Sequence, residues 1–265
     1  MTRPDLPVDL FDFDLPDDLI ALRPAVPRTA SLLLFSEGER LSDEAFASLP
    51  QLLRPGDLLV FNDTKVIPAR MNGTRTRGES TVNVEANLIE RLTPSTWRAL
   101  ARPGKRLREG DRIDFAGDLP ATVTAKEEGG AIQLRFEVSG AELDAAVAQS
   151  GVMPLPPYIA ARRPADGQDN HDYQTIFATN EGAVAAPTAA LHFDKALLDD
   201  LKRAGIDSAR VTLHVGAGTF LPVKSETTGG HVMHSESGTI DSQTAEQINL
   251  AKSRGGRIIC VGTTA

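Results

Sequence analysis

Two stretches in the second half of the chain combine glycine and threonine with a histidine. Residues 182–193 contain His192, and residues 213–223 contain His214. In the second stretch an apolar run leads into the sequence Gly-Ala-Gly-Thr at residues 216–219. Glycines let the backbone approach a ligand closely, and a threonine hydroxyl both donates and accepts hydrogen bonds. The second stretch therefore predicts a ligand-binding loop, whereas in the first the same small residues would also serve tight helix–sheet packing.

Histidine suits proton transfer because its unperturbed pKa of about 6.5 lies near neutral pH. His231 and His234 lie three residues apart, a spacing that could suit a metal site on a helix. Gly229 and Gly230 precede them and the flanks are not helical, so no metal site is predicted. A lone histidine at a strand end can also be purely structural, and which group is base and which is acid stays open. The candidate catalytic residues are His192, His214, His231, His234 and Glu236.

Polar residues follow an apolar, strand-like run at the end of the first quarter of the chain. Asn62, Asp63 and Thr64 come directly after it, and the cations Lys65 and Arg70 are close behind. Ligands bind outside the carboxyl ends of strands in open α/β sheets, and these cations suit phosphate or carboxylate. The same polar residues could form a plain Asx-turn.

One segment of an acidic protein is basic. The formal net charge of the chain is -8, whereas residues 65–112 hold 11 basic and 5 acidic residues, or +6. Such a segment suits a phosphate-contacting face, although a solvated β-surface would look the same. The candidate RNA-binding residues are Arg98, Arg102, Lys105, Arg106 and Arg108.

Two kinds of sequence pattern alternate along the chain and predict an α+β multidomain protein. Helical patterns at 194–205 and 242–254, the second with Ser242 as N-cap, each precede a short apolar strand. Such repeats predict an α/β layered domain with a partly parallel sheet, made of residues 1–65 and 151–265. Short alternating runs with glycine turns predict a small inserted β-barrel at residues 66–150. Residues 161–172 are polar and predict a flexible loop.

Composition limits the class of protein. The chain has 265 residues with 41% hydrophobic content, which is ordinary for a globular protein. It shows no signal peptide and no apolar run near the roughly 20 residues of a membrane span. The only cysteine, Cys260, excludes an intrachain disulfide or a cysteine-based zinc site, and its apolar surroundings predict burial. We expect a cytoplasmic protein that does not bind membranes.

Several motifs, taken in order, resemble the S-adenosylmethionine:tRNA ribosyltransferase-isomerase family of queuosine biosynthesis. The resemblance runs from about Asp12 to the last residue, and the known family fold is also an α/β domain with an inserted barrel. The matching stretches are residues 61–70, 153–159, 173–175, 182–193, 213–223, 231–236 and 261–264.

The resemblance implies a transferase that consumes S-adenosylmethionine as a ribosyl donor. The implied acceptor is 7-aminomethyl-7-deazaguanine at the tRNA wobble position, and the products are epoxyqueuosine, adenine and methionine. This chemistry needs a base beside the sulfonium, a proton donor for adenine and a dry pocket, but no cofactor or metal. We expect a monomer whose partners are tRNA and S-adenosylmethionine. The implied substrate-binding residues are Asn62, Asp63, Thr64, Lys65, Arg70, Tyr158, Tyr173, Gln174, Thr188, Gly216, Gly218, Thr219, Gly262 and Thr263.

Two departures from the family pattern matter. The chain reads Arg28-Thr29-Ala30-Ser31-Leu32, without the second arginine that the family usually has shortly after its Arg-x-x-Ser, and it ends at Ala265, where the family continues. We therefore expect a truncated form that is loosely packed and has little activity. The alternatives are a non-catalytic RNA-binding module, an inactive truncated homologue, or a methyltransferase that would yield S-adenosylhomocysteine.

Overall fold

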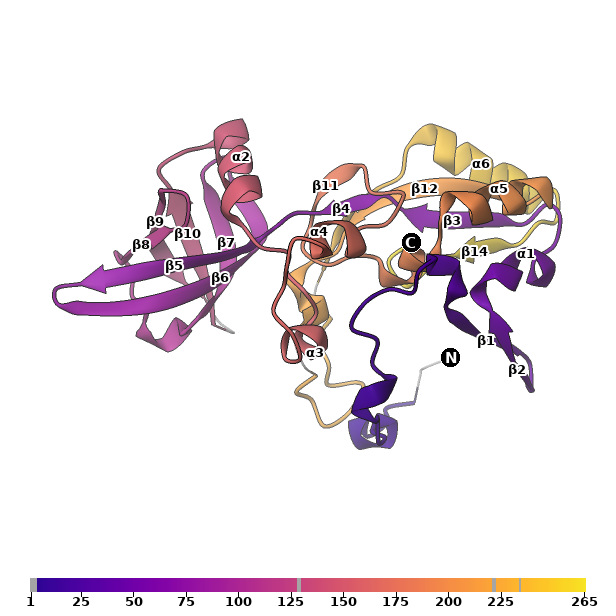
Figure 1. The fold of residues 1–265 in the computed structure, drawn as a ribbon, viewed down its shortest axis with the longest axis horizontal. Helices are drawn as coiled ribbons and strands as arrows, with labels where there is room; N and C mark the ends of the chain where they lie inside the picture. Colours follow the sequence, from indigo (N-terminus) through magenta and orange to yellow (C-terminus); the bar gives the residue numbers. More distant parts are fainter. Residues whose placement is uncertain (1–3, 128–129, 221–222, 234) are drawn as a thin grey trace.

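The computed structural model describes residues 4–127, 130–220, 223–233 and 235–265. Figure 1 shows a β-barrel on the left of the view and a layered α/β body on the right, with the N-terminal segment below. The predicted fold class is confirmed, including the partly parallel sheet. The limits of the two domains, at residues 65–66 and 150–151, stay a prediction.

The barrel is closed by antiparallel pairing in the order β10-β7-β6-β5-β8-β9. Alternate side chains of each strand point inward, as the period of two in a β-strand requires, so that Val84, Ala86 and Leu88 of β6 are buried. Helix α2, which the sequence did not predict, adds Leu143 and Val147 to the same core. The elements are β5 (Arg70–Arg77), β6 (Ser80–Thr93), β7 (Thr96–Arg102), β8 (Arg112–Phe115), β9 (Leu119–Lys126), β10 (Ala131–Phe136) and α2 (Gly140–Ser150).

The α/β body is built around a sheet in the order β13-β12-β3-β14. Strand β3 pairs in parallel with β12 and β14, and all five of its residues are buried, as expected of a central strand covered on both faces. Leu197 and Leu201 of α5 pack with Leu59 and Phe61 of β3, while α6 contacts β12 and β14. The elements are β3 (Leu58–Asn62), β12 (Asp207–His214), β13 (Ser237–Thr239), β14 (Ile258–Cys260), α5 (Lys195–Arg203) and α6 (Ser242–Ser253).

Smaller elements surround this sheet. Strands β1 and β2 form an antiparallel hairpin, and β11 pairs in parallel with β4. Strand β4 follows β3 after a single residue, Asp63, which therefore lies at the carboxyl end of the central strand. The elements are β1 (Leu32–Glu37), β2 (Arg40–Ala45), α1 (Leu49–Leu52), β4 (Thr64–Val66), α3 (Pro157–Ala160), α4 (Asp169–Asp172) and β11 (Asn180–Ala183).

The N-terminal segment is held to the rest of the chain by Arg28. Its guanidinium donates hydrogen bonds to the backbone oxygens of His171, Asp172, Gln174 and Leu191 at 2.9–3.3 Å. Burial lowers the pKa of this guanidinium, and Asp172 partly opposes the effect. One cation thus joins the N-terminal segment to two separate segments of the α/β body.

The expectation of a flexible loop at residues 161–172 was wrong. Asp169 is only 1% exposed and is paired with Arg163 and Arg23, while Asp172 also contacts Arg23. Arg163 further donates to the backbone oxygen of Leu22 at 3.1 Å. The polar composition reflects these ion pairs, because buried carboxylates require charged partners.

Two smaller expectations also need correction. Cys260 is exposed, because it lies on the edge strand β14 and points away from the face on which Ile259 packs. The N-cap of α6 is Asp241, whose side chain accepts a hydrogen bond from the backbone nitrogen of Thr244 at 2.6 Å, and Ser242 is the first helical residue.

Candidate functional site

The first group of predicted site residues lies at the carboxyl ends of β3 and β12. Asn62 is fully buried, and its amide donates to the backbone oxygens of Leu213 and Thr264 at 2.8 and 2.9 Å. Its side-chain oxygen accepts from the backbone nitrogens of Thr64 and Leu213. Asn62 therefore cross-links three segments of backbone, which explains an amide at the end of an otherwise apolar strand.

Asp63 is the next residue and holds a second, more accessible junction. Its carboxylate accepts hydrogen bonds from the Thr212 hydroxyl at 2.7 Å and from the Asn180 amide at 3.0 Å. Asn180 also donates to the Thr212 hydroxyl at 3.0 Å. These three side chains come from the end of β3, from β12 and from β11, and they fix the strands around the end of the sheet.

His214 ends strand β12 and lies beside Thr64, with Nδ1 2.9 Å from the threonine hydroxyl oxygen. The imidazole is half-buried. It packs against the backbone of Gly182, where a Cβ would lie 2.9 Å from the ring atoms Cε1 and Nδ1. An imidazole with one nitrogen on a hydroxyl keeps its other nitrogen free of that bond, so this group can accept or donate a proton.

The glycine-rich loop follows His214 directly. Gly216 donates its backbone N–H to a carboxylate oxygen of Glu236 at 2.8 Å, and Gly218 and Thr219 lie in a short 3-10 helix, Ala217–Phe220. The exposed Glu236 thus orders the loop beside His214. His234, another predicted catalytic residue, lies outside the described residues.

A second group of predicted residues lines a cavity of about 250 Å³. Tyr158, Tyr173, Thr188 and His192 all face it. Tyr173 is buried, and burial raises the pKa of its hydroxyl, whereas Tyr158 is exposed. These four residues thus line one cavity, and their role in binding or catalysis stays a prediction.

His192 is held by a hydroxyl group and by an aromatic ring. Its Nδ1 lies 2.9 Å from the Ser31 hydroxyl oxygen, and its ring centroid lies 5.2 Å from that of Phe46. Burial lowers the pKa of this imidazole below its usual 6.5, and the Arg28 guanidinium lowers it further. Both effects favour the neutral imidazole, and His192 packs as part of the wall of the smaller cavity.

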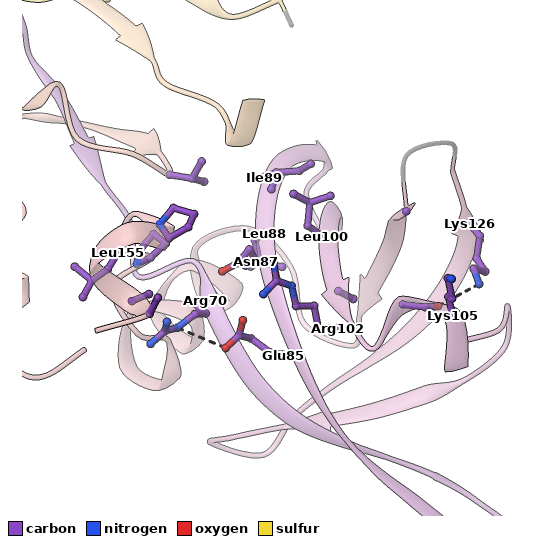
Figure 2. A pocket seen from close by; sticks show the side chains of 18 residues that line it. Arg70, Glu85, Asn87, Leu88, Ile89, Leu100, Arg102, Lys105, Lys126 and Leu155 are labelled. Atoms are coloured by element: carbon purple, nitrogen blue, oxygen red, sulfur yellow. Dashed lines mark hydrogen bonds and ion pairs between the residues drawn. The ribbon is translucent and has the colours of Figure 1, made fainter. Parts of the chain in front are cut away.

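A third group lines a larger cavity of about 800 Å³ between the barrel and the α/β body. Arg70, Arg102 and Lys105 contribute to its surface (Figure 2). Leu155 faces both this cavity and the smaller one, so the proline-rich segment 153–159 forms a wall between them. Arg102 and Lys105, two of the five predicted RNA-binding cations, thus line the same cavity as Arg70, a predicted substrate-binding residue.

Ion pairing divides the basic segment into two parts. Arg91 is paired with Asp144, and Arg77 with Asp111 at 2.6 Å. Arg98 is paired with Glu90 and Glu127. In contrast, no acidic partner within 4.0 Å is found, in the part of the chain that the structure describes, for Arg102, Lys105, Arg106 and Arg108.

Several predicted site residues have other partners. Lys65 is paired with Glu181 at 2.8 Å. The Gln174 amide exchanges two hydrogen bonds with the backbone of Val66, at 2.7 and 3.1 Å, which ties segment 173–175 to β4. Among the described residues, no side-chain hydrogen bond joins His231 to the rest of the predicted site. Lys65 and Gln174 thus bind neighbouring parts of the protein, whereas His231 lies apart from the predicted site.

The end of the described chain lies close to the 182–193 stretch. Gly262 has a φ of +100°, which a glycine adopts readily, and a Cβ there would lie 3.4 Å from the Ala189 side chain. Thr263 is exposed, and the Thr264 backbone oxygen is held by Asn62. Gly262 and Thr263 are thus brought to the same edge of the sheet as the His214 group.

Sequence reasoning missed residues that lie on β11 and on the barrel. Asn180 completes the Asp63 junction, yet its position just before the 182–193 stretch carried no motif. Glu85 and Asn87 face the larger cavity. The alternation of polar and apolar residues in β6 could have shown that Glu85 and Asn87 point away from the barrel core. It could not have shown which part of the protein lies opposite them.

Among the described residues, no helix is long and apolar enough to cross a membrane.

Comparison with known proteins gives consistent matches along the whole chain. Similar curated proteins named S-adenosylmethionine:tRNA ribosyltransferase-isomerase include one from Methylobacterium sp. (strain 4-46), 58% identical over 97% of this chain and 75% of its own length. One from Phenylobacterium zucineum is 56% identical over 96% of this chain and 74% of its own length. A crystal structure of S-adenosylmethionine tRNA ribosyltransferase from Thermotoga maritima matches with 29% identity and a TM-score of 0.39, over 94% of this chain and 68% of that one. A family model described as "Queuosine biosynthesis protein" matches residues 8–265, so the chain belongs to that family.

Proposed function

We propose that the protein is a tRNA-modifying S-adenosylmethionine:tRNA ribosyltransferase-isomerase that acts in queuosine biosynthesis. The observation that carries this proposal is the 58% identity to a protein of that name over 97% of the chain. Identity at this level spans the His214 group, both cavities and the barrel. In this reaction S-adenosylmethionine is a substrate whose ribosyl group is transferred and isomerised onto 7-aminomethyl-7-deazaguanine at the tRNA wobble position, with release of adenine and methionine.

In this proposal His214 is the group that moves a proton. It lies at a strand end, next to a glycine-rich loop, with its Nδ1 beside the Thr64 hydroxyl and its ring packed against the Gly182 backbone. His192 supports the smaller cavity instead, because its ring is packed on Phe46 and its Nδ1 is engaged by Ser31. General acid–base catalysis by one side chain accounts for about 10²- to 10⁴-fold in rate.

The Gly216 loop and the carboxylate of Glu236 position the donor in this proposal. Backbone N–H groups and small residues can approach a ligand without steric obstruction, as the loop at residues 216–219 allows. Because the tRNA acceptor is a cytoplasmic molecule, we also place the protein in the cytoplasm. The monomeric state stays a prediction.

The test is release of adenine and methionine from S-adenosylmethionine in the presence of precursor-bearing tRNA. We expect slow but measurable release by the wild-type protein and a loss of at least about 100-fold in kcat for His214→Gln. His192→Gln serves as the comparison and should lose less in kcat than His214→Gln. S-adenosylhomocysteine as the only donor product would contradict the proposal and indicate a methyltransferase. Binding of tRNA with no donor consumption would indicate an RNA-binding module.

A further inference from the structure

The outer face of the barrel carries a polar array at the point where it meets the α/β body. Outward-pointing residues of β5, β6 and β7 lie side by side in the sheet register: Arg70 pairs with Asn87, and Asn87 with Leu100. One step along the strands, Glu85 pairs with Arg102. The buried residues Ala86 and Leu88 alternate with these positions, so the array points away from the barrel core.

The array forms one wall of the larger cavity. Figure 2 shows Glu85 between Arg70 and Arg102, with Asn87 beside them. The opposite wall is apolar and comes from the α/β body, where Leu155, Pro157 and Ala160 face the cavity. A cavity of about 800 Å³ with apolar walls and a few convergent polar groups is typical of small-molecule sites, and it exceeds what one nucleobase needs.

The polar groups of this wall are incompletely satisfied. The Nε of Arg70 is buried and has no hydrogen-bond partner among the described residues, and it lies 4.0 Å from a carboxylate oxygen of Glu85. Buried polar groups in folded proteins nearly always have a partner. The cavity is therefore lined by an arginine whose buried Nε lacks a partner and by a carboxylate that can accept hydrogen bonds from a ligand.

A carboxylate only accepts hydrogen bonds, so Glu85 selects for a ligand edge that presents donors. The Watson–Crick edge of guanine, or of a 7-deazaguanine, presents the N1–H and the exocyclic amino group side by side, whereas adenine presents an acceptor at N1. The Asn87 amide can both donate and accept, so it can pair with the remaining polar atoms of such a base. The polar wall thus matches a guanine-type base better than an adenine.

The surroundings indicate that the base belongs to a nucleic acid, which in the proposed function is RNA. Arg102 and Lys105 line the cavity, and Arg106 and Arg108 continue the cationic track beyond it without acidic partners in the described part of the chain. Cations in series suit successive phosphates, and S-adenosylmethionine carries no phosphate. Enzymes that modify a base in RNA or DNA take it out of the stack into a pocket.

We propose that this cavity binds a guanine-type nucleotide extruded from RNA, with Glu85 and Asn87 reading the base and Arg102 and Lys105 contacting phosphates. The inference rests on the proposed function, because it assigns the RNA substrate of that reaction to a place. It adds two specificity residues on β6, which belong to none of the motifs found in the sequence.

The test measures binding of two RNA hairpins that differ only in one loop purine, guanine or adenine, to the full 265-residue chain. We expect the guanine hairpin to bind about 10-fold tighter, and Glu85→Gln to reduce this preference to below about 3-fold. Arg102→Gln should weaken both hairpins equally and lower the salt slope by about 1. Arg112→Gln, which removes a cation elsewhere on the barrel, is the matched control and should leave the preference unchanged.

Equal binding of the two hairpins by the wild-type protein, or an unchanged preference in Glu85→Gln, would overturn the inference. Loss of S-adenosylmethionine binding in Glu85→Gln with hairpin binding intact would also overturn it, because the cavity would then hold the donor. These measurements need no donor turnover, so their failure is distinct from failure of the proposed function. Adenine release without discrimination between the two hairpins would support the proposed function and contradict this assignment. Discrimination between the hairpins without adenine release would support this assignment and contradict the proposed function.

Discussion

Gly182 packs against His214 so closely that no side chain fits between them. A Cβ at residue 182 would lie 2.9 Å from Cε1 and Nδ1 of the imidazole, and the φ of Gly182 is +144°. Strand β11 thereby holds the ring against the Thr64 hydroxyl, which lies 2.9 Å away on β4. The position of the proposed proton-transfer group therefore depends on the lack of a side chain at residue 182 of β11.

We expect Gly182→Ala to displace the imidazole and lower kcat about 100-fold, because an error of about 1 Å in a catalytic group can cost that much. Gly110→Ala is the control for backbone strain, since Gly110 also has a positive φ, +84°, but nothing lies within 4 Å of its Cβ position. It should lose about 1 kcal/mol of stability and keep kcat. The measurement is adenine release together with thermal unfolding. A fully active Gly182→Ala protein would show that the ring position does not matter.

The stability of the sheet should depend on pH through Asp57. Its carboxylate accepts from Arg257 at 2.5 and 3.0 Å and from the Arg54 backbone nitrogen at 2.8 Å. The hydrogen bond from Arg257 is the main reason why the pKa of Asp57 falls from 3.8 to about 2, despite burial. Because the folded state disfavours protonation, this contribution is complete above about pH 5 and disappears as the pH falls through 3.8 toward 2.

We therefore expect Asp57→Asn to lower the free energy of unfolding by roughly 2 kcal/mol at pH 7, and by much less near pH 2. Urea unfolding of both proteins at several pH values measures the difference directly, and other carboxylates cancel in the subtraction. Asp207→Asn, on an exposed residue of β12, is the matched control with little effect. A difference that stayed constant from pH 7 to pH 2 would rule out this origin.

The unpaired cations of the barrel should govern RNA affinity. We expect the double change of Lys105 and Arg106 to Gln to weaken tRNA binding and lower the slope of log affinity against log salt by about 2, because fewer counterions are released. The same double change at Arg91 and Arg112 removes equal charge, but acidic neighbours already hold those side chains. Equal slopes for the two double variants would contradict a localised RNA-binding face.

The local patterns of the sequence predicted the barrel and the parallel strands because the period of apolar residues distinguishes strands from helices. Glycine turns between alternating runs indicated the barrel, and apolar runs after helices indicated the parallel strands around β3. Helix α2 was missed because its apolar face is narrow, with only Leu143 and Val147 buried. Cys260 was expected inside because an apolar run does not show whether its strand is central or at an edge.

Contacts between distant segments could not be predicted in the same way. Asp169 looked like part of a mobile polar loop until Arg23, 146 residues away in the chain, was placed on it. The alternation of β6 places Glu85 and Asn87 outside the barrel core, but nothing in β6 shows that α3 and the proline-rich segment lie opposite. A polar residue in a sequence can either face solvent or contact a distant part of the chain. Only the folded structure shows which of the two it does.

The last prediction concerns Arg28, which donates to four backbone oxygens of residues 171–191 and so holds the N-terminal segment in place. Arg28→Gln leaves those oxygens short of donors, so we expect a loss of about 3 kcal/mol in urea unfolding. Arg28→Lys should not restore it, because a single ammonium cannot match a planar fork of donors. Arg40→Gln, on the exposed hairpin strand β2, is the control and should stay within about 0.5 kcal/mol of wild type. A Lys variant as stable as wild type would show that charge alone, and not the geometry of the guanidinium, anchors this segment.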